Sequence, residues 1–134
     1  MKILVTDDSK MARKMVIKTL QEALDDKNYE ILEAQNGQES VDLYKEHNPN
    51  IVFMDLTMPV MDGFEALKRI KEFNENAKVV VISADIQKQA MDKVRELGAL
   101  NFVKKPIDLK KMQQILNDVL RLRNLSYFHV QRPF

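Results

Sequence analysis

The sequence contains no cysteine and no apolar run long enough to cross a membrane. The absence of cysteine excludes disulfides, thiolate chemistry and iron–sulfur clusters, and it fits a reducing cellular interior. A membrane-spanning helix needs about 20 apolar residues. The apolar stretch that follows Met1 ends at Val5, which is also too short for the apolar part of a signal peptide. We therefore expect a cytoplasmic protein.

The sequence also lacks an excess of either charge. Its 21 basic and 20 acidic side chains nearly cancel, so no overall field attracts nucleic acid or an anionic membrane. A hydrophobic content of 45% excludes a disordered chain, and 134 residues suffice for one domain with its own core. We expect this domain to span residues 1–122 and residues 123–134 to form a short tail.

Short apolar segments alternate with helical patterns along the whole chain. We expect strands at residues 2–6, 29–34, 51–54, 78–83 and 100–104. Helices are expected from Ser9, as N-cap, to about Asp25, over residues 39–47, and after Asp62, Asp85 and Pro106. This strict alternation indicates an α/β fold, in which a doubly wound, five-stranded parallel sheet carries helices on both faces.

Helical spacing also predicts the side chains that face the core. Among them we expect Met15 or Val16, Phe73, Ile86 and Leu109. The methionines are interpreted as adaptable packing residues, namely Met11, Met15, Met54, Met58, Met61, Met91 and Met112. The basic residues of the first helix are interpreted as a solvated face, made of Lys10, Arg13, Lys14 and Lys18.

Polar residues stand where the predicted strands end. These are Asp7 and Asp8, Asp55, Ser83 and Lys105. Because parallel strands share one carboxyl edge, we expect these side chains to meet there. Three neighbouring carboxylates repel one another unless a cation lies among them, and an all-oxygen ligand set suits Mg²⁺. Zinc is disfavoured, because both histidines lie far from these strand ends.

A magnesium site beside a free carboxylate, a hydroxyl and an ammonium group suits phosphoryl transfer. We expect Asp55, on the central strand, to be the nucleophile that becomes an acyl phosphate. Asp8 would bind the metal, Asp7 would support it directly or through water, and the main-chain carbonyl of Thr57 is placed to be a further ligand.

Four ordered motifs resemble the receiver domain of two-component response regulators, particularly stand-alone chemotaxis-type, CheY-like ones. The matching segments are residues 5–9 with Arg13, 49–63, 81–84, and 98–106 through Phe102 to Lys105-Pro106. Together they extend over residues 1 to about 120. The resemblance implies a flavodoxin-like fold with strand order 2-1-3-4-5.

The resemblance also implies a role for each matching residue. Asp55 would receive phosphate from a sensor histidine kinase or phosphotransfer protein, with Mg²⁺ held by Asp7, Asp8, Asp55 and the Thr57 carbonyl. Lys105 would bind the phosphoryl group. Ser83 would swing toward that group, and Phe102 would rotate inward as the space empties. The Lys105–Pro106 bond would be cis. Self-phosphorylation and self-dephosphorylation are implied, in a protein that is not otherwise an enzyme.

With no output domain expected in the short tail, signalling would occur by contact with a downstream protein. The implied contact face is the fourth helix, fifth strand and fifth helix. A monomer is expected, with dimerisation through that face open on phosphorylation. The partner could be a flagellar switch, an enzyme, or a histidine domain in a phosphorelay. The basic face of the first helix could instead meet an acidic kinase or phosphotransfer surface.

Three departures from the family pattern bear on function. Ser83 replaces the commoner threonine, Phe102 a tyrosine, and Thr6 a valine. Phe102 has no hydroxyl group for a partner to contact. Thr57 and Asp85 stand two residues after Asp55 and Ser83, where the family tunes hydrolysis of the acyl phosphate. We expect Asp85 to position the attacking water.

Several alternatives remain at this stage. A small Mg²⁺ phosphatase of the haloacid-dehalogenase type also uses an Asp at a strand end, but it needs a second acid where this chain has Thr57. A flavodoxin-type flavin carrier would need a phosphate loop where Asp7 and Asp8 stand. Asp55 could be a structural residue that caps the next turn. The chain could also be a degenerate, non-phosphorylated receiver, and Phe102 could be an ordinary half-buried core residue. Nucleic-acid binding has no supporting motif.

Overall fold

The structure is a computed structural model that describes residues 1–24 and 28–124. Within these residues strands and helices alternate strictly. The strands are β1 (Lys2–Thr6), β2 (Glu30–Ala34), β3 (Ile51–Met54), β4 (Val79–Ser83) and β5 (Asn101–Lys104). The helices are α1 (Lys10–Ala23), α2 (Gly37–His47), α3 (Gly63–Phe73), α4 (Lys88–Glu96) and α5 (Leu109–Asn124). The predicted alternation is confirmed.

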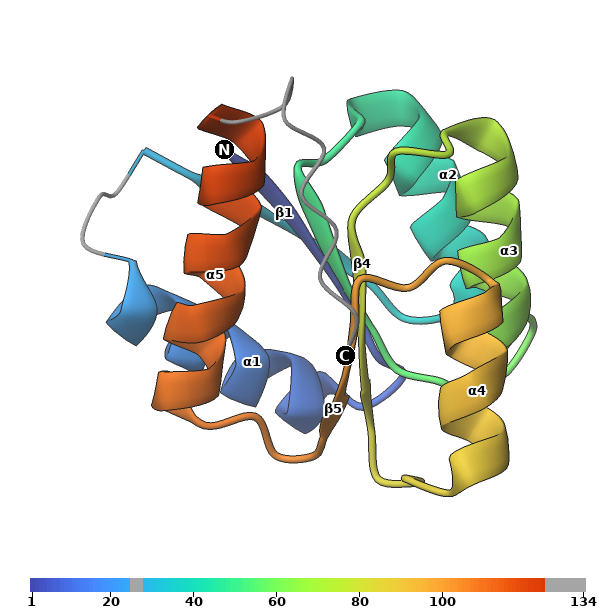
Figure 1. The fold of residues 1–134 in the computed structure, drawn as a ribbon. Helices are drawn as coiled ribbons and strands as arrows, with labels where there is room; N and C mark the ends of the chain where they lie inside the picture. The colour runs from blue at the N-terminus through green and yellow to red at the C-terminus, as the bar shows by residue number, and fades with distance from the viewer. Residues whose placement is uncertain (25–27, 125–134) are drawn as a thin grey trace.

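All strand pairs are parallel, and the sheet has the order β2-β1-β3-β4-β5. Helices α1 and α5 cover one face, and α2, α3 and α4 cover the other (Figure 1). Each face has its own apolar core, one centred on Leu4, Val52 and Val81 and the other on Ile3, Phe53 and Val80. The doubly wound, flavodoxin-like fold expected from the sequence is therefore present.

Burial explains why each strand has its composition. Strands β3 and β4 are buried along their whole length, which matches their continuous apolar sequences. Strand β2 lies at the sheet edge, where its two glutamates are exposed and Ile31 and Leu32 are only partly buried. The central strands thus carry the residues that lead into the acidic carboxyl edge.

Four helices begin at side-chain caps. Ser9, Asn36, Asp62 and Asp108 each accept a hydrogen bond from the main-chain N–H three residues later. The expected cap at Asp85 is wrong: α4 begins at Lys88, and its N-cap residue Gln87 makes no side-chain capping bond. The carboxylate of Asp85 instead accepts from the main-chain N–H of Gln87 in the turn before the helix.

Several side chains predicted to be packed are exposed, namely Met11, Met15, Phe73, Ile86 and Leu109. Ile86 precedes α4, so helical spacing does not apply to it. Phe73 and Leu109 are terminal residues of α3 and α5, where a helix no longer has the sheet beneath it. Phe73 packs its ring edge-on against Tyr44, with a 6.3 Å separation of ring centroids.

Helix α5 continues past the expected domain boundary at residue 122. The rest of the expected tail, residues 125–134, lies outside the described residues, as does the predicted end of α1 near Asp25. Among the described helices, none has the length and apolar character needed to cross a bilayer.

Candidate functional site

Two buried aspartates follow neighbouring strands at the same level. Thr6 pairs with Met54 across β1 and β3, so Asp7 and Asp55 come next in register. The main-chain N–H of Asp55 donates to the carbonyl of Thr6 at 3.0 Å, which extends the pairing into the site. Both aspartates are almost completely buried. The hydrogen bonding of the sheet therefore fixes their relative position.

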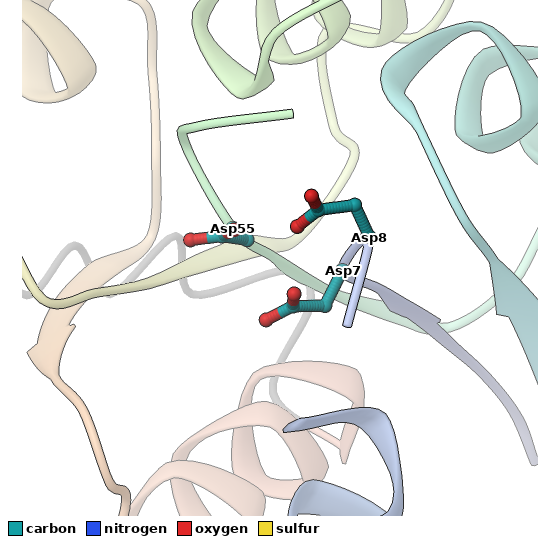
Figure 2. Close-up of side chains that lie close together, drawn as sticks. All are labelled: Asp7, Asp8 and Asp55. Carbon is teal, nitrogen blue, oxygen red and sulfur yellow. The ribbon is translucent and has the colours of Figure 1, made fainter. Parts of the chain in front are cut away.

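Asp8 completes an acidic cluster with these two residues. The three side chains turn their carboxylates to the same side of the sheet edge (Figure 2). One carboxylate oxygen from each of them lies within 4.8 Å of the others. Asp8 is exposed, so the cluster is open to solvent on its side. The predicted convergence of Asp7, Asp8 and Asp55 is present in the structure.

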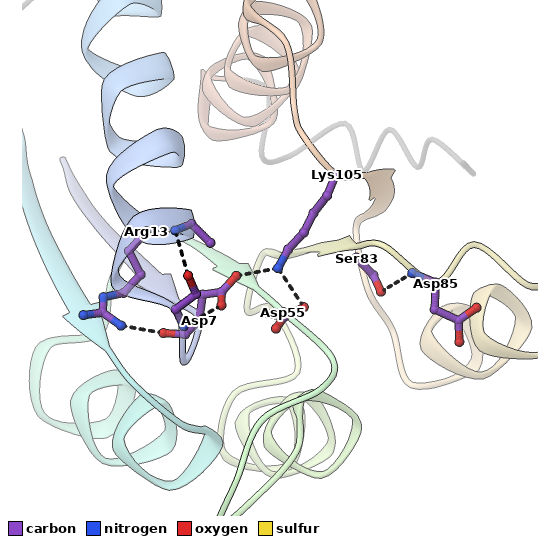
Figure 3. Close-up of polar contacts among 8 residues, drawn as sticks. Asp7, Arg13, Asp55, Ser83, Asp85 and Lys105 are labelled. Carbon is purple, nitrogen blue, oxygen red and sulfur yellow. Dashed lines mark hydrogen bonds and ion pairs between the residues drawn. The ribbon is translucent and has the colours of Figure 1, made fainter.

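Lys105 places its ammonium group between two of these carboxylates. Its Nζ atom lies 2.7 Å from Asp7 Oδ2 and 3.4 Å from Asp55 Oδ1 (Figure 3). The residue follows β5, where its main-chain N–H donates to the carbonyl of Ser83, and its peptide bond to Pro106 is cis. Burial lowers the pKa of Lys105, but the hydrogen bond to Asp7 and the two negative charges outweigh this effect and raise it. Lys105 is therefore a permanent cation at the site.

The pKa of Asp55 is raised above its usual range. The main cause is burial, and the charge of Asp7 adds to it. The charge and hydrogen bond of Lys105, together with a main-chain hydrogen bond from Leu56, act in the opposite direction without cancelling the shift. A second cation beside Asp55 would favour its charged, nucleophilic form.

A buried arginine supports the loop that carries the first two aspartates. Arg13 Nη1 donates to the main-chain carbonyl of Asp7 at 2.7 Å (Figure 3). Arg13 Nε pairs with Glu33 Oε1 at 2.9 Å. The main-chain N–H of Ser9 donates to Asp7 Oδ1 from the other side. The expectation that Arg13 belongs to a solvated basic face is wrong, since only 8% of the residue is exposed.

Helical spacing could have located Arg13 on the inner face of α1. It lies three and seven residues before Val16 and Leu20, which pack against the core. The charge of Arg13 instead suggested that its side chain is exposed to solvent. A buried guanidinium needs several acceptors, and the sequence does not show that a main-chain carbonyl and Glu33 supply them.

Ser83 and Phe102 are both buried, on the neighbouring strands β4 and β5. The Ser83 hydroxyl accepts a hydrogen bond from the main-chain N–H of Asp85 at 3.0 Å and is turned away from Asp55 (Figure 3). Phe102 packs in the core on the side of α2, α3 and α4. Burial of Phe102 therefore does not require Ser83 to give up its bond to Asp85.

The segment after Asp55 approaches α3 very closely. Thr57 has an exposed side chain two residues past Asp55. Gly63 begins α3, and its N–H donates to the carbonyl of Leu56 at 2.8 Å. A Cβ atom on Gly63 would lie 2.0 Å from the main-chain oxygen of Asp55, so no other residue fits without moving the backbone. The glycine thus lets α3 pack directly beneath the loop.

The described geometry suits a divalent cation with oxygen ligands. Three carboxylates at this separation, two of them buried, need more positive charge than Lys105 alone provides. The set contains oxygen donors and no imidazole, which fits Mg²⁺ better than zinc or copper. Solvent access at Asp8 leaves room for metal-bound water.

Comparison with known proteins gives a consistent result. Residues 3–117 match the family model described as the response regulator receiver domain. The chain is 41% identical over 123 residues to "Chemotaxis protein CheY" of Treponema pallidum, covering 90% of this chain and 83% of that protein. It is 32% identical over 123 residues to "Sporulation initiation phosphotransferase F" of Bacillus subtilis, covering 92% and 96%.

A solved structure agrees with these sequence relatives. The structure is similar to that of a CheX–CheY–BeF3–Mg complex from Borrelia burgdorferi, with a TM-score of 0.75 and 36% identity. The match covers 89% of this chain and 88% of that one. The similarity thus extends over nearly the whole described sheet and its helices.

Proposed function

Because this chain belongs to the response regulator receiver domain family, we propose that it accepts a phosphoryl group on Asp55 in a Mg²⁺-dependent reaction. One observation carries the proposal. The nearly buried carboxylate of Asp55 lies within 4.8 Å of those of Asp7 and Asp8 and 3.4 Å from the ammonium group of Lys105. A divalent cation held by these carboxylates, together with the ammonium group, would balance the negative charge of a transferring phosphoryl group.

Asp7, Asp8, Asp55 and the main-chain carbonyl of Thr57 would hold the Mg²⁺ ion. When bound, the ion neutralises negative charge on the phosphoryl oxygens. The protein's own contribution is positional. The β1–β3 pairing sets the separation of Asp7 and Asp55, and Ser9 and Arg13 fix the carboxylate and carbonyl of Asp7.

The phosphoryl donor is proposed to be a phosphohistidine of a sensor histidine kinase or phosphotransfer protein. A carboxylate oxygen of Asp55 attacks the phosphorus, the bond from phosphorus to the histidine nitrogen breaks, and an acyl phosphate forms on Asp55. Lys105 binds a phosphoryl oxygen during the transfer. Its contact with Asp55 supports this proposed role.

The proposed signal begins with Ser83. Rotation of its hydroxyl toward the phosphoryl group would give up its bond to the Asp85 N–H, which costs about 1 kcal/mol. The charge-assisted bond to a phosphoryl oxygen is stronger and offsets this cost. Ser83 and Phe102 belong to β4 and β5, so the change would reach the face formed by α4, β5 and α5.

We propose that a downstream protein binds this face in a phosphorylation-dependent manner and that the protein works as a cytoplasmic chemotaxis regulator. The support is the similarity to CheY proteins, one of which forms a complex with CheX in its crystal structure. The sporulation phosphotransferase relative favours a second candidate, an intermediate that passes phosphate to another histidine domain. We further propose that the protein phosphorylates and dephosphorylates itself. Thr57 and Asp85 would tune the hydrolysis rate of the acyl phosphate. Residues 1–122 would form the functional unit.

Labelling with acetyl phosphate, followed by intact mass spectrometry, tests the phosphoacceptor. The wild-type protein should gain one phosphoryl group with Mg²⁺ and none with EDTA. Asp55→Ala should gain none, whereas Asp42→Ala, at an exposed acid of α2, should behave as wild type. An adduct that persists in Asp55→Ala would refute the assignment.

A further inference from the structure

A partly open cavity of about 540 Å³ lies beside the acidic site, between α1 and the segment that joins β5 to α5. Asp7, Asp55 and Lys105 line it, so it adjoins the proposed phosphoacceptor directly. Its α1 lining extends from Ala12 to Glu22, which corresponds to roughly 15 Å along a helix axis. The cavity therefore has the length of a short hydrocarbon chain and continues away from the site.

The walls near the acidic site are apolar. Ala12 and Val16 contribute from α1, Val5 and Phe53 from the sheet, and Ile107 from the segment before α5. Besides the acidic site and its neighbour Thr6, the polar lining residues lie farther along α1, at Lys18, Thr19 and Glu22. Volumes of about 300–1,000 Å³ with apolar walls and a few polar groups at one end are typical of small-molecule sites. The cavity suits a ligand with a hydrocarbon body and an anionic head at Lys105.

We infer that this cavity receives the acyl group of small-molecule phosphodonors, so that the protein prefers acyl phosphates with apolar acyl chains to acetyl phosphate. The inference rests on the proposed phosphorylation of Asp55. A carboxylate oxygen of Asp55 forms a bond to phosphorus, and the bond between phosphorus and the acyl oxygen breaks. The acyl group leaves as a carboxylate anion, and no proton or electron is exchanged with another reactant.

Charge and burial favour this orientation of the donor. Lys105 attracts the phosphoryl end, because its ammonium group lies 3.4 Å from the Asp55 carboxylate. The acyl end of the donor is uncharged before transfer and becomes a carboxylate after it, and burying that charge against the apolar walls is unfavourable, so the acyl group is released after transfer. The apolar walls gain free energy when hydrocarbon replaces water. This gain ends where the hydrocarbon chain of the donor would reach Lys18 and Glu22.

Acetyl phosphate and butyryl phosphate make a matched pair of donors. Acetic and butyric acids are similarly acidic, so the intrinsic reactivity of the two phosphorus–oxygen bonds is nearly equal. Each buried methylene contributes about a fourfold gain, so butyryl phosphate, with two more methylenes, should label Asp55 about 10- to 20-fold faster than acetyl phosphate. Intact mass spectrometry over time, at donor concentrations below saturation, gives the two apparent second-order rate constants.

Ala12→Leu fills the cavity and should bring the butyryl-to-acetyl ratio close to one. Gln21→Leu is its control, because Gln21 is an exposed α1 residue outside the cavity lining. It should keep the ratio of the wild type. Val16→Ala enlarges the cavity and should move the preference toward hexanoyl phosphate, which keeps the test independent of how well Ala12→Leu folds.

The outcomes separate the two proposals. Equal rate constants for acetyl and butyryl phosphate in the wild type would overturn the acyl site and leave Asp55 as phosphoacceptor. A preference for butyryl phosphate that neither Ala12→Leu nor Val16→Ala alters would also overturn it. No adduct from any donor would overturn the proposed phosphorylation and the acyl site together.

Discussion

Arg13 holds the main-chain carbonyl of Asp7 with a 2.7 Å hydrogen bond, although its guanidinium lies on a helix and the aspartate follows a strand. The same side chain pairs with Glu33 on β2 at 2.9 Å. The bond fixes the backbone at the point where Asp7 and Asp8 turn into the site. Arg13 is therefore a positioning residue for the proposed metal ligands.

Arg13→Met should weaken Mg²⁺ binding and the fold. It leaves the buried carbonyl of Asp7 without its donor, which costs about 1–3 kcal/mol in the free energy of unfolding. Isothermal titration with Mg²⁺ should show a dissociation constant raised several-fold, and Arg13→Lys should recover part of the loss. Lys14→Met, at the exposed neighbouring position, is the control. An unchanged Mg²⁺ affinity in Arg13→Met would refute the positioning role.

Lys105→Met should destabilise the protein most strongly when Mg²⁺ is absent. The change removes the cation between Asp7 and Asp55. Breaking a fully buried ion pair costs roughly 3–5 kcal/mol, and partial exposure of Lys105 reduces the expected loss to about 1–2 kcal/mol. Urea unfolding in EDTA and in Mg²⁺ measures it. Lys104→Met, at the exposed adjacent residue, should lose almost nothing. Equal losses in both buffers would contradict the prediction.

Asp55→Asn should become more stable than the wild type as the pH rises. Burial and the charge of Asp7 raise the pKa of Asp55 in the folded protein. The folded state then binds this proton more tightly than the unfolded chain. Its contribution to stability is complete below the unfolded pKa and is lost as the pH rises through the folded pKa.

Urea unfolding in EDTA at several pH values tests this linkage. The two proteins should be about equally stable in acid, where Asp55 is protonated, and should diverge toward neutral pH. Mg²⁺ should reduce the difference at neutral pH, because the cation favours ionised Asp55. A difference independent of pH would contradict the raised pKa.

Gly63→Ala should be far more damaging than Gly98→Ala. A Cβ atom at residue 63 would meet the main-chain oxygen of Asp55 at 2.0 Å, where only backbone movement gives relief. At residue 98 it would meet the flexible end of the Lys71 side chain at 2.8 Å, and the φ of +94° adds strain. We expect a loss above about 3 kcal/mol for the first and about 1–2 kcal/mol for the second. Thermal unfolding of both variants measures the two losses of stability, and a larger loss for Gly98→Ala than for Gly63→Ala would contradict the prediction.

The sequence predicted those parts of the molecule that depend on local pattern. Continuous apolar runs, β-branched in β4, marked β3 and β4 as strands buried on both faces, and alternation of apolar and polar residues marked β2 as near the edge. The acidic convergence followed from parallel strands sharing one carboxyl edge, which needed no knowledge of side-chain contacts. Asp7, Asp8 and Asp55 were therefore placed together correctly.

The errors lie where tertiary contacts override local pattern. Arg13 looks solvated by charge and is buried, because Asp7 and Glu33 satisfy it. Met15 has the helical spacing of a core residue, but it is half exposed and lines the cavity beside α1. Asp85 looks like a helix cap, but its carboxylate closes a turn before α4. Each outcome depends on residues distant in sequence or on a turn that spacing cannot resolve.

The pairing of Thr6 with Met54 makes assembly of the proposed site depend on correct folding of the central sheet. A slip of one residue between β1 and β3 would turn Asp55 to the opposite face of the sheet and separate it from Asp7. The phosphoacceptor proposed here therefore does not exist in an incompletely assembled chain. An incompletely folded chain would therefore not be phosphorylated at Asp55, because the β1–β3 hydrogen bonds that stabilise the centre of the sheet also bring Asp55 and Asp7 together.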